Sequence, residues 1–170
     1  MTEIRFPEEK MTLLLNVKKE DIDLKKYQEI SKGFEQKSEF HITIIGFRGG
    51  KEIKKALLLL NQSNQFIMIE KIKTLVGETD WDYFFLNVAY QISKEYSNTD
   101  KRESIIQLAE VPGFVKFYDS LNEMLNLQLE YPLIHATLFT RGTDLEKSKM
   151  GIGINSEIDF FELNPLCIKI

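Results

Sequence analysis

The chain has 170 residues and a hydrophobic fraction of 43%, including 12 Phe and 6 Tyr. This size and composition predict a single domain over residues 1–170 with a normal hydrophobic core, and they exclude an intrinsically disordered chain. The net charge of −4 disfavours a protein that tracks long nucleic acid, because binding to the phosphate backbone requires a basic surface.

The cysteine content and the apolar segments predict the compartment. Cys167 is the only cysteine, so no intramolecular disulfide can form and nothing demands an oxidising environment. The first ten residues lack the basic start and apolar run of a signal peptide, and the longest apolar stretch, near 56–60, is too short to span a bilayer. We therefore expect a cytoplasmic monomer with no membrane association.

The first half of the chain is predicted to alternate between strands and helices. An apolar segment bounded by charges predicts a strand over 11–17, and apolar residues at helical spacing predict a helix over 21–31. Period-2 alternation predicts strands over 39–47 and 66–75, and a 3.6-residue period predicts a helix over 51–61.

The second half has a less regular pattern. Aromatic and β-branched residues predict a strand over 81–88, and helices are predicted over 100–109, 114–127 and 144–149. Alternation predicts a further strand over 133–140. Three short β elements are expected near the C-terminus, over 151–154, 158–163 and 166–170.

The two histidines of the chain lie in the same sequence frame. The first is in Phe40-His41-Ile42-Thr43-Ile44, and the second is in Ile134-His135-Ala136-Thr137-Leu138. In both copies the residues one before, one after and three after the His are apolar, as in a half-buried strand. His and Thr, two residues apart, are therefore predicted to share the other face of each strand.

This pair of motifs suits acid–base chemistry on an anion. Imidazole and imidazolium are both populated near pH 7, so two histidines across a cleft can act as general base and general acid in one reaction. The two Thr hydroxyls can donate to the oxygens of a phosphoryl group, and this chemistry requires neither a metal nor a cofactor. The competing interpretation is that the motifs are two ordinary strand histidines.

At these motifs the sequence resembles the 2H phosphoesterase superfamily, which includes the RNA 2',3'-cyclic phosphodiesterases once described as 2',5'-RNA ligases. The superfamily carries two His-x-Thr or His-x-Ser motifs with apolar flanks, separated by most of a domain. The continuations Ile44-Ile45-Gly46-Phe47 and Leu138-Phe139-Thr140-Arg141 are also similar to the family pattern. The resemblance implies an α+β fold, a bilobal pseudo-twofold domain whose two antiparallel sheets line a central groove, with the helices outside.

The resemblance also implies an activity. It predicts a metal-independent phosphodiesterase that acts on 2',3'-cyclic phosphates, 2',5' linkages or small cyclic nucleotides, with a nucleotide or a short RNA end as its substrate. The implied catalytic residues are His41, Thr43, His135 and Thr137, with either His as the base. The alternative is a non-catalytic module that binds nucleotides or RNA ends in the same groove.

Five further residues are candidates for substrate binding. Arg48 and Arg141 follow the two motifs, and a basic residue often follows the second motif in this superfamily. Phe139 is expected to share the face of the second motif by alternation and to form a floor or rim of the groove. The Tyr131 hydroxyl could reach the substrate or pack at the entry to the strand, and Trp81 could stack on a base or lie in the core.

Glycines separate the first motif from the helix expected after it. Arg48-Gly49-Gly50-Lys51 lacks the remainder of a phosphate-binding P-loop. We expect this segment to be a loop, with anion binding as the alternative.

Overall fold

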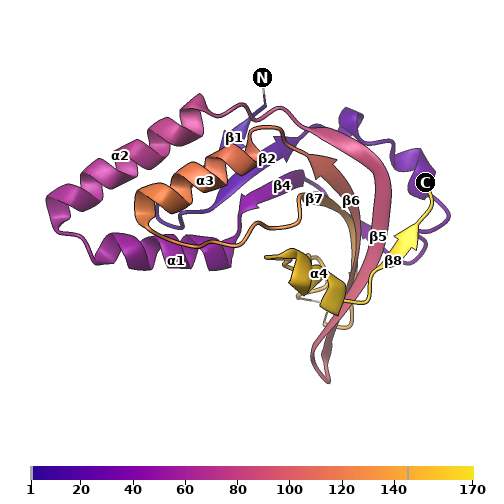
Figure 1. Cartoon of the computed structure of the whole chain (residues 1–170). Helices are drawn as coiled ribbons and strands as arrows, with labels where there is room; N and C mark the ends of the chain where they lie inside the picture. Colours follow the sequence, from indigo (N-terminus) through magenta and orange to yellow (C-terminus); the bar gives the residue numbers. More distant parts are fainter. Residues whose placement is uncertain (1, 145) are drawn as a thin grey trace.

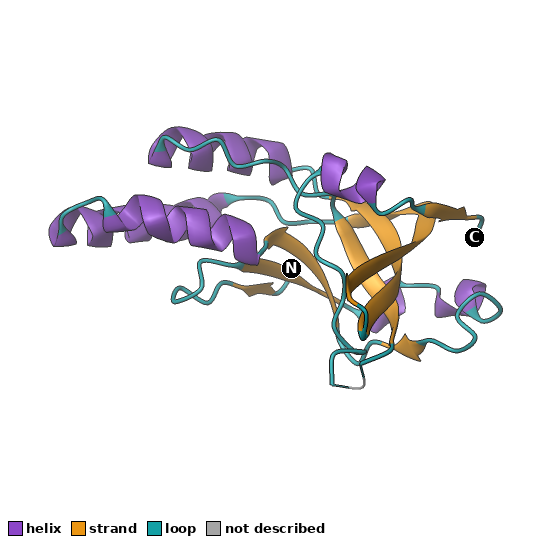
Figure 2. Cartoon of the chain, turned by 90° about the horizontal axis from the view of Figure 1, so that it is seen from below, coloured by secondary structure: helices purple, strands orange, loops and turns teal. Residues whose placement is uncertain are grey.

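Eight strands form one antiparallel sheet with four α-helices beside it in the computed structural model, which describes residues 2–144 and 146–170 (Figure 1; Figure 2). The strands are β1 (Ile4–Arg5), β2 (Leu13–Val17), β3 (Glu35–Gln36), β4 (Phe40–Ile45), β5 (Phe84–Ser97), β6 (Asp100–Glu110), β7 (His135–Gly142) and β8 (Leu166–Ile168). The α-helices are α1 (Phe47–Leu58), α2 (Gln62–Glu78), α3 (Phe114–Leu125) and α4 (Glu157–Glu162), and the 3₁₀ helices are η1 (Lys19–Asp21) and η2 (Leu24–Tyr27). None of the helices in the described part of the chain combines the length and hydropathy of a membrane span.

The sheet joins the two motif strands at its centre. Its strand order is β1-β2-β4-β7-β6-β5-β8, and β3 also pairs with β7. The α+β class is as expected, but the expected separation into two sheets is wrong. The sheet is continuous because β4 and β7 pair with each other, with Ile42 opposite Ala136.

The sheet has two faces with different coverings. The side that carries Ile42 and Ala136, which we call the core face, shares one buried cluster with Ile53 of α1, Ile72 of α2 and Leu121 of α3. The opposite side, which we call the motif face, is covered near β5 and β6 by α4. Figure 1 shows these long strands curving, with α4 inside the curve. The motif strands thus lie beside the part of the motif face that α4 covers.

Elements with one clearly apolar face were predicted correctly. The structure has β2 within 11–17, β4 within 39–47, α3 within 114–127, and β8 within 166–170. The strand predicted over 133–140 is β7, which begins two residues later and continues to Gly142.

The strand predicted over 66–75 is wrong, because these residues lie in α2. Asn61 caps this helix, and its side-chain oxygen accepts a hydrogen bond of 2.9 Å from the backbone N–H of Asn64. Ile72 and Val76 point into the core, whereas Phe66 and Ile67 are exposed. The exposed apolar residues hid the helical period in the sequence.

The helix predicted over 100–109 is also wrong, because these residues form β6, which pairs with β5 along a long hairpin. The neighbours Ile105 and Ile106 are both fully buried, one in each of the two hydrophobic clusters. Consecutive apolar residues are expected in a strand whose two faces are both covered, and they obscure the period-2 pattern.

Three shorter predictions also differ from the structure. The segment 21–31 contains 3₁₀ helix and turns instead of an α-helix, and the described residues of 144–149 form turns. Of the last β elements, 151–154 has no strand, and 158–163 lies mostly in α4. Ser156 explains α4, because its side-chain oxygen accepts a hydrogen bond from the N–H of Asp159 and caps the helix.

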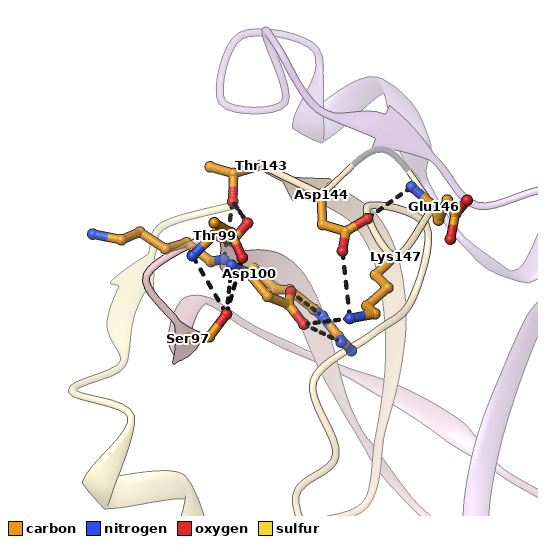
Figure 3. Close-up of polar contacts among 9 residues, drawn as sticks. Ser97, Thr99, Asp100, Thr143, Asp144, Glu146 and Lys147 are labelled. Carbon is orange, nitrogen blue, oxygen red and sulfur yellow. Dashed lines mark hydrogen bonds and ion pairs between the residues drawn. The ribbon is translucent and has the colours of Figure 1, made fainter.

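A polar cluster fixes the tip of the β5–β6 hairpin to the turn after β7 (Figure 3). The guanidinium of Arg102 donates two hydrogen bonds, of 2.8 and 2.7 Å, to the Asp100 carboxylate, and both side chains are buried. Lys147 lies 3.6 Å from the same carboxylate. The Thr143 hydroxyl donates to the Thr99 carbonyl at 2.7 Å. These contacts anchor the turn after β7, from which the chain continues along the motif face to α4.

We expect Asp100→Asn to lower the thermal midpoint at pH 7, because it leaves the buried Arg102 without its charge partner. The hydrogen bonds from Arg102 hold the pKa of Asp100 below its usual range. Stabilisation by the carboxylate is therefore present above the ordinary carboxyl pKa and is lost as the pH falls through the lowered value. Thermal unfolding should show a large difference from wild type at pH 7, and this difference should shrink progressively as the pH is lowered below the ordinary carboxyl pKa of 3.8. Glu95→Gln, in an exposed pair with Lys101, should change little at any pH in this range.

Candidate active site

Both motifs place their polar side chains on the same face of the sheet. Ile42 and Ala136 lie opposite each other in β4 and β7 and are fully buried. Because side chains alternate along a strand, the residues on either side of this pair point to the motif face. These residues are His41, Thr43, His135 and Thr137, and each is partly buried. The antiparallel register brings each His next to the Thr of the other strand.

A β-bulge follows the Thr of each motif. The pairing of β4 with β2 skips Ile44, and the pairing of β7 with β6 skips Leu138. In both strands the skipped residue comes directly after the Thr of the motif. A bulge inserts one extra residue and changes the face on which the following side chains lie.

The bulge in β7 explains why two expected binding residues lie away from the motif face. Phe139 is buried in the core, with its ring 5.9 Å from that of Tyr27, and does not form the floor of a groove. Arg141 lies two residues further and shares the face of Phe139. Its guanidinium pairs with Glu103 at 2.7 Å and lies 4.3 Å from the ring centroid of Phe34.

His41 lies in a positively charged environment. Burial lowers its pKa below the ordinary value, and the charges of Arg5, Lys37 and His135 lower it further, against the smaller opposing effect of Glu39, which pairs with Arg5 at 3.3 Å. Arg5 comes from β1, and its Nε atom is buried and has no hydrogen-bond partner among the described residues. The Lys37 ammonium donates to the Lys149 carbonyl at 2.9 Å. The neutral imidazole is therefore the favoured form of His41.

Arg5 and Lys37 were not predicted as site residues. Arg5 is far from both histidines in the sequence, Lys37 precedes His41 by only four residues, and neither lies in a motif. Arg5 approaches His41 because β1 pairs with β2 and β2 pairs with β4. Two consecutive strand pairings thus bring Arg5 to the site.

His135 is oriented by the backbone. Its Nδ1 lies 2.7 Å from the carbonyl oxygen of Leu133, which accepts a hydrogen bond and therefore requires a proton on Nδ1. Nε2 is then the nitrogen that accepts a proton when the ring is neutral and donates one when it is charged. Burial lowers the pKa of His135, and the hydrogen bond to Leu133 partly opposes this shift.

The chain contains only these two histidines, so their ring signals can be followed by NMR without interference. We expect both pKa values to lie below 6.5. Arg5→Met should raise the pKa of His41 and leave that of His135 nearly unchanged, because Arg5 lowers only the first. A His41 pKa that is unaltered in Arg5→Met would contradict the charged environment described above.

The lowered pKa values also determine how stability depends on pH. As the pH falls, the histidines of the unfolded chain bind protons near pH 6.5, before those of the folded chain. The free energy of unfolding should therefore decrease between about pH 7 and pH 5. A double variant with Asn at both positions should show a smaller decrease in denaturant unfolding.

Tyr131 and Trp81 have structural partners. The Tyr131 hydroxyl donates to the carboxylate of Asp119, and its ring lies 5.3 Å from that of Tyr118. Trp81 is only 4% exposed, and its indole N–H donates to the Val76 carbonyl at 2.7 Å. Trp81 is thus a core residue and does not offer a stacking face.

Arg48 is the one expected binding residue that lies beside a motif. It lines a pocket of about 300 Å³ together with Thr43. The predicted loop at Gly49 and Gly50 is instead the first part of α1. This helix begins after Gly46, which provides no side-chain cap for the first N–H groups.

Within residues 2–144 and 146–170, no group of three or more His, Cys, Asp or Glu residues could hold a metal ion. No protein-family model matches the chain, and no curated protein or solved structure is significantly similar to it.

Proposed function

We propose that the protein is a metal-independent phosphodiesterase of the 2H type, acting on 2',3'-cyclic phosphates, 2',5' linkages, or other small nucleotide or RNA-end substrates. The observation that carries this proposal is the convergence of both His-x-Thr motifs on one face of two paired strands. Two proton carriers and two hydroxyl donors are the groups that phosphoryl transfer without a metal requires.

Two features support our assignment of the chain to this superfamily and a pseudo-twofold, bilobal arrangement of its strands. The motif strands meet at the centre of the sheet, so that β1, β2 and β4 lie on one side and β7, β6, β5 and β8 on the other. Each motif strand also has its bulge directly after the Thr. A local twofold axis between Ile42 and Ala136 would relate these features. We place the protein in the cytoplasm as a monomer, consistent with its composition.

The environments of the two histidines favour different roles. The positive charges near His41 favour its neutral form, so we assign it as the base that removes a proton from water. Burial lowers the pKa of His135 as well, but its hydrogen bond to Leu133 opposes this shift and no cation among the described residues adds to it, so we assign His135 as the acid. The negative charge of a bound phosphate would further favour a protonated His135.

In this mechanism a 2',3'-cyclic phosphate is opened in one step with two proton transfers. The water oxygen bonds to phosphorus as His41 takes its proton. The bond between phosphorus and one ribose oxygen breaks, and His135 gives a proton to that oxygen. Thr43 and Thr137 donate hydrogen bonds to the non-bridging oxygens, and Arg5 and Lys37 offset the negative charge.

The test is turnover by the purified protein in EDTA. The substrates are 2',3'-cyclic nucleotides, a 2',5'-linked oligonucleotide, a cyclic dinucleotide and ADP-ribose cyclic phosphate. We expect hydrolysis of at least one, and turnover lowered by roughly 10²- to 10⁴-fold in the double variant His41→Ala, His135→Ala. Turnover that requires added zinc or manganese would overturn the proposal. Nucleotide binding without turnover would instead identify the non-catalytic binding module.

A further inference from the structure

A pocket opens beside the first motif. Its volume is about 300 Å³, and its walls come from the start of α1, the segment 128–132 before β7, and the residues just before α4. Thr43 lines this pocket and also belongs to the proposed catalytic group, so a substrate held there would extend directly from the reacting phosphate. Further residues that line the pocket are Gly46 and four with polar or charged side chains, Arg48, Glu52, Glu130 and Asn155.

The side-chain amide of Asn155 has a fixed orientation. Its backbone N–H and its Nδ2 both donate to Oδ2 of Asp159, at 3.1 and 2.9 Å. A carboxylate only accepts hydrogen bonds, so the atom facing Asp159 must be the amide nitrogen. These hydrogen bonds hold the pKa of Asp159 below its usual range, and the nearby charge of Arg48 contributes to this shift. Asp159 is therefore ionised at neutral pH and maintains the orientation.

The oxygen of the same amide faces the pocket. Asn155 Oδ1 lies 3.9 Å from the position that a Cβ atom would occupy on Gly46, which lines the pocket with Thr43. The lining of the pocket therefore includes a fixed hydrogen-bond acceptor, Asn155, and a cationic donor, Arg48. Such a pair suits a planar group that carries an amino donor and a neighbouring ring acceptor.

We propose that this pocket binds the nucleobase and that Asn155 selects bases with an amino group over bases with a carbonyl in the same position. This inference rests on the proposed function and specifies its substrate class. A carbonyl facing Asn155 would leave two acceptors in contact without a proton between them, which costs binding energy. Adenine is therefore preferred to hypoxanthine, and cytosine to uracil.

The charge and size of the pocket favour a base over a second phosphate. Glu52 and Glu130 line it beside the cation Arg48. Glu52 also pairs with Lys55 at 2.8 Å, so the described lining has no excess of positive charge that would hold a second phosphate. The volume is at the lower end of the range for ligand pockets, which suits one base and excludes a run of stacked nucleotides.

The test compares adenosine and inosine 2',3'-cyclic phosphates. In inosine a carbonyl replaces the amino group of the base, and the neighbouring N1 changes from an acceptor to an N–H donor. We expect the wild-type kcat/KM to be about five- to tenfold higher for adenosine, as for one hydrogen bond between neutral groups. In Asn155→Ala the ratio should fall to within about twofold of unity. Asn87→Ala, at an exposed position in β5, should keep the wild-type ratio.

Binding of adenosine and inosine 2'-monophosphates, measured by calorimetry, separates this inference from the proposed function. Equal turnover and binding of the two nucleotides by wild type would overturn the base pocket and leave the phosphodiesterase in place. A binding preference that depends on Asn155, without any turnover, would support the pocket and overturn the proposed enzyme. Retention of the preference in Asn155→Ala would exclude Asn155 as its source. The wild-type comparison requires no variant, so it tests the preference for adenosine over inosine nucleotides even if Asn155→Ala fails to fold.

Discussion

Replacing either His41 or His135 with Ala should lower the turnover of the best substrate by roughly 10²- to 10⁴-fold, the usual loss when a general acid or base is removed. Both imidazoles are only partly buried and lie on the motif face, so the fold should survive. The double variant should lose little beyond the worse single variant, because the two histidines act as one unit. Steady-state kinetics and far-UV circular dichroism of the same preparations test this prediction. A double variant with wild-type turnover would overturn the mechanism.

The assignment of His41 as base and His135 as acid predicts different responses to the leaving group. A p-nitrophenolate leaves without protonation, so a nucleoside 3'-(p-nitrophenyl) phosphate needs no general acid. On this substrate the turnover of His135→Ala should approach that of wild type, whereas the turnover of His41→Ala should remain well below it. The opposite pattern would exchange the two roles, and equal impairment would mean that neither ring acts as the acid.

Thr43→Val and Thr137→Val provide the comparison with residues that transfer no proton. Each variant keeps the shape of the side chain and removes one hydroxyl. The expected loss is about 1.5 to 3 kcal/mol of transition-state stabilisation per hydroxyl, the value for a hydrogen bond to a charged group. The pH profile of kcat should keep its limbs in these variants, whereas each His variant should lose one limb.

The shared face of His and Thr within each motif could be predicted because it depends on local alternation. Apolar residues flank His41 and His135 in the same way, and each strand must bury those residues to fold. That burial turns His and Thr to the other face of the strand. The sequence could not predict that β4 and β7 are direct neighbours, because strand order depends on contacts between distant segments.

Residues beyond the motifs were predicted less well, for two physical reasons. Alternation assigned Phe139 to the motif face, but it fails after a bulge, and the residues skipped by the pairing have no sequence signature here. Arg5 reaches His41 only through the pairing of β1, β2 and β4. A contact that requires several strand pairings cannot be inferred from spacing in one sequence.

The helix and strand assignments failed where both sides of an element are apolar. β6 is covered on both faces, and α2 has exposed Phe66 and Ile67 opposite its buried residues. In each case the hydrophobic pattern lost its period. For α2 and α4 the remaining signal was the cap, supplied by Asn61 and Ser156.

Gly50→Ala should destabilise the protein by about 3 kcal/mol, although Ala favours helices. Gly50 lies within α1, where Ala would ordinarily add roughly 1 kcal/mol of stability. A Cβ at this position would lie 2.4 Å from the Lys10 carbonyl oxygen and 2.9 Å from that of Met11. Both obstacles are backbone atoms, so the chain leading into β2 must shift to accept the methyl group.

Gly77→Ala is the matched control for this prediction. Gly77 also lies in a helix, α2, and a Cβ there would meet nothing within 4 Å. This variant should gain roughly 0.5 to 1 kcal/mol, so the two Gly→Ala changes should have opposite signs in urea unfolding. Since β2 pairs with β4, displacement of its entry in Gly50→Ala should also disturb the first motif and lower turnover. Stabilisation by both variants would mean that the Lys10 carbonyl can move away, and that the close approach of α1 to this segment is not what positions β2.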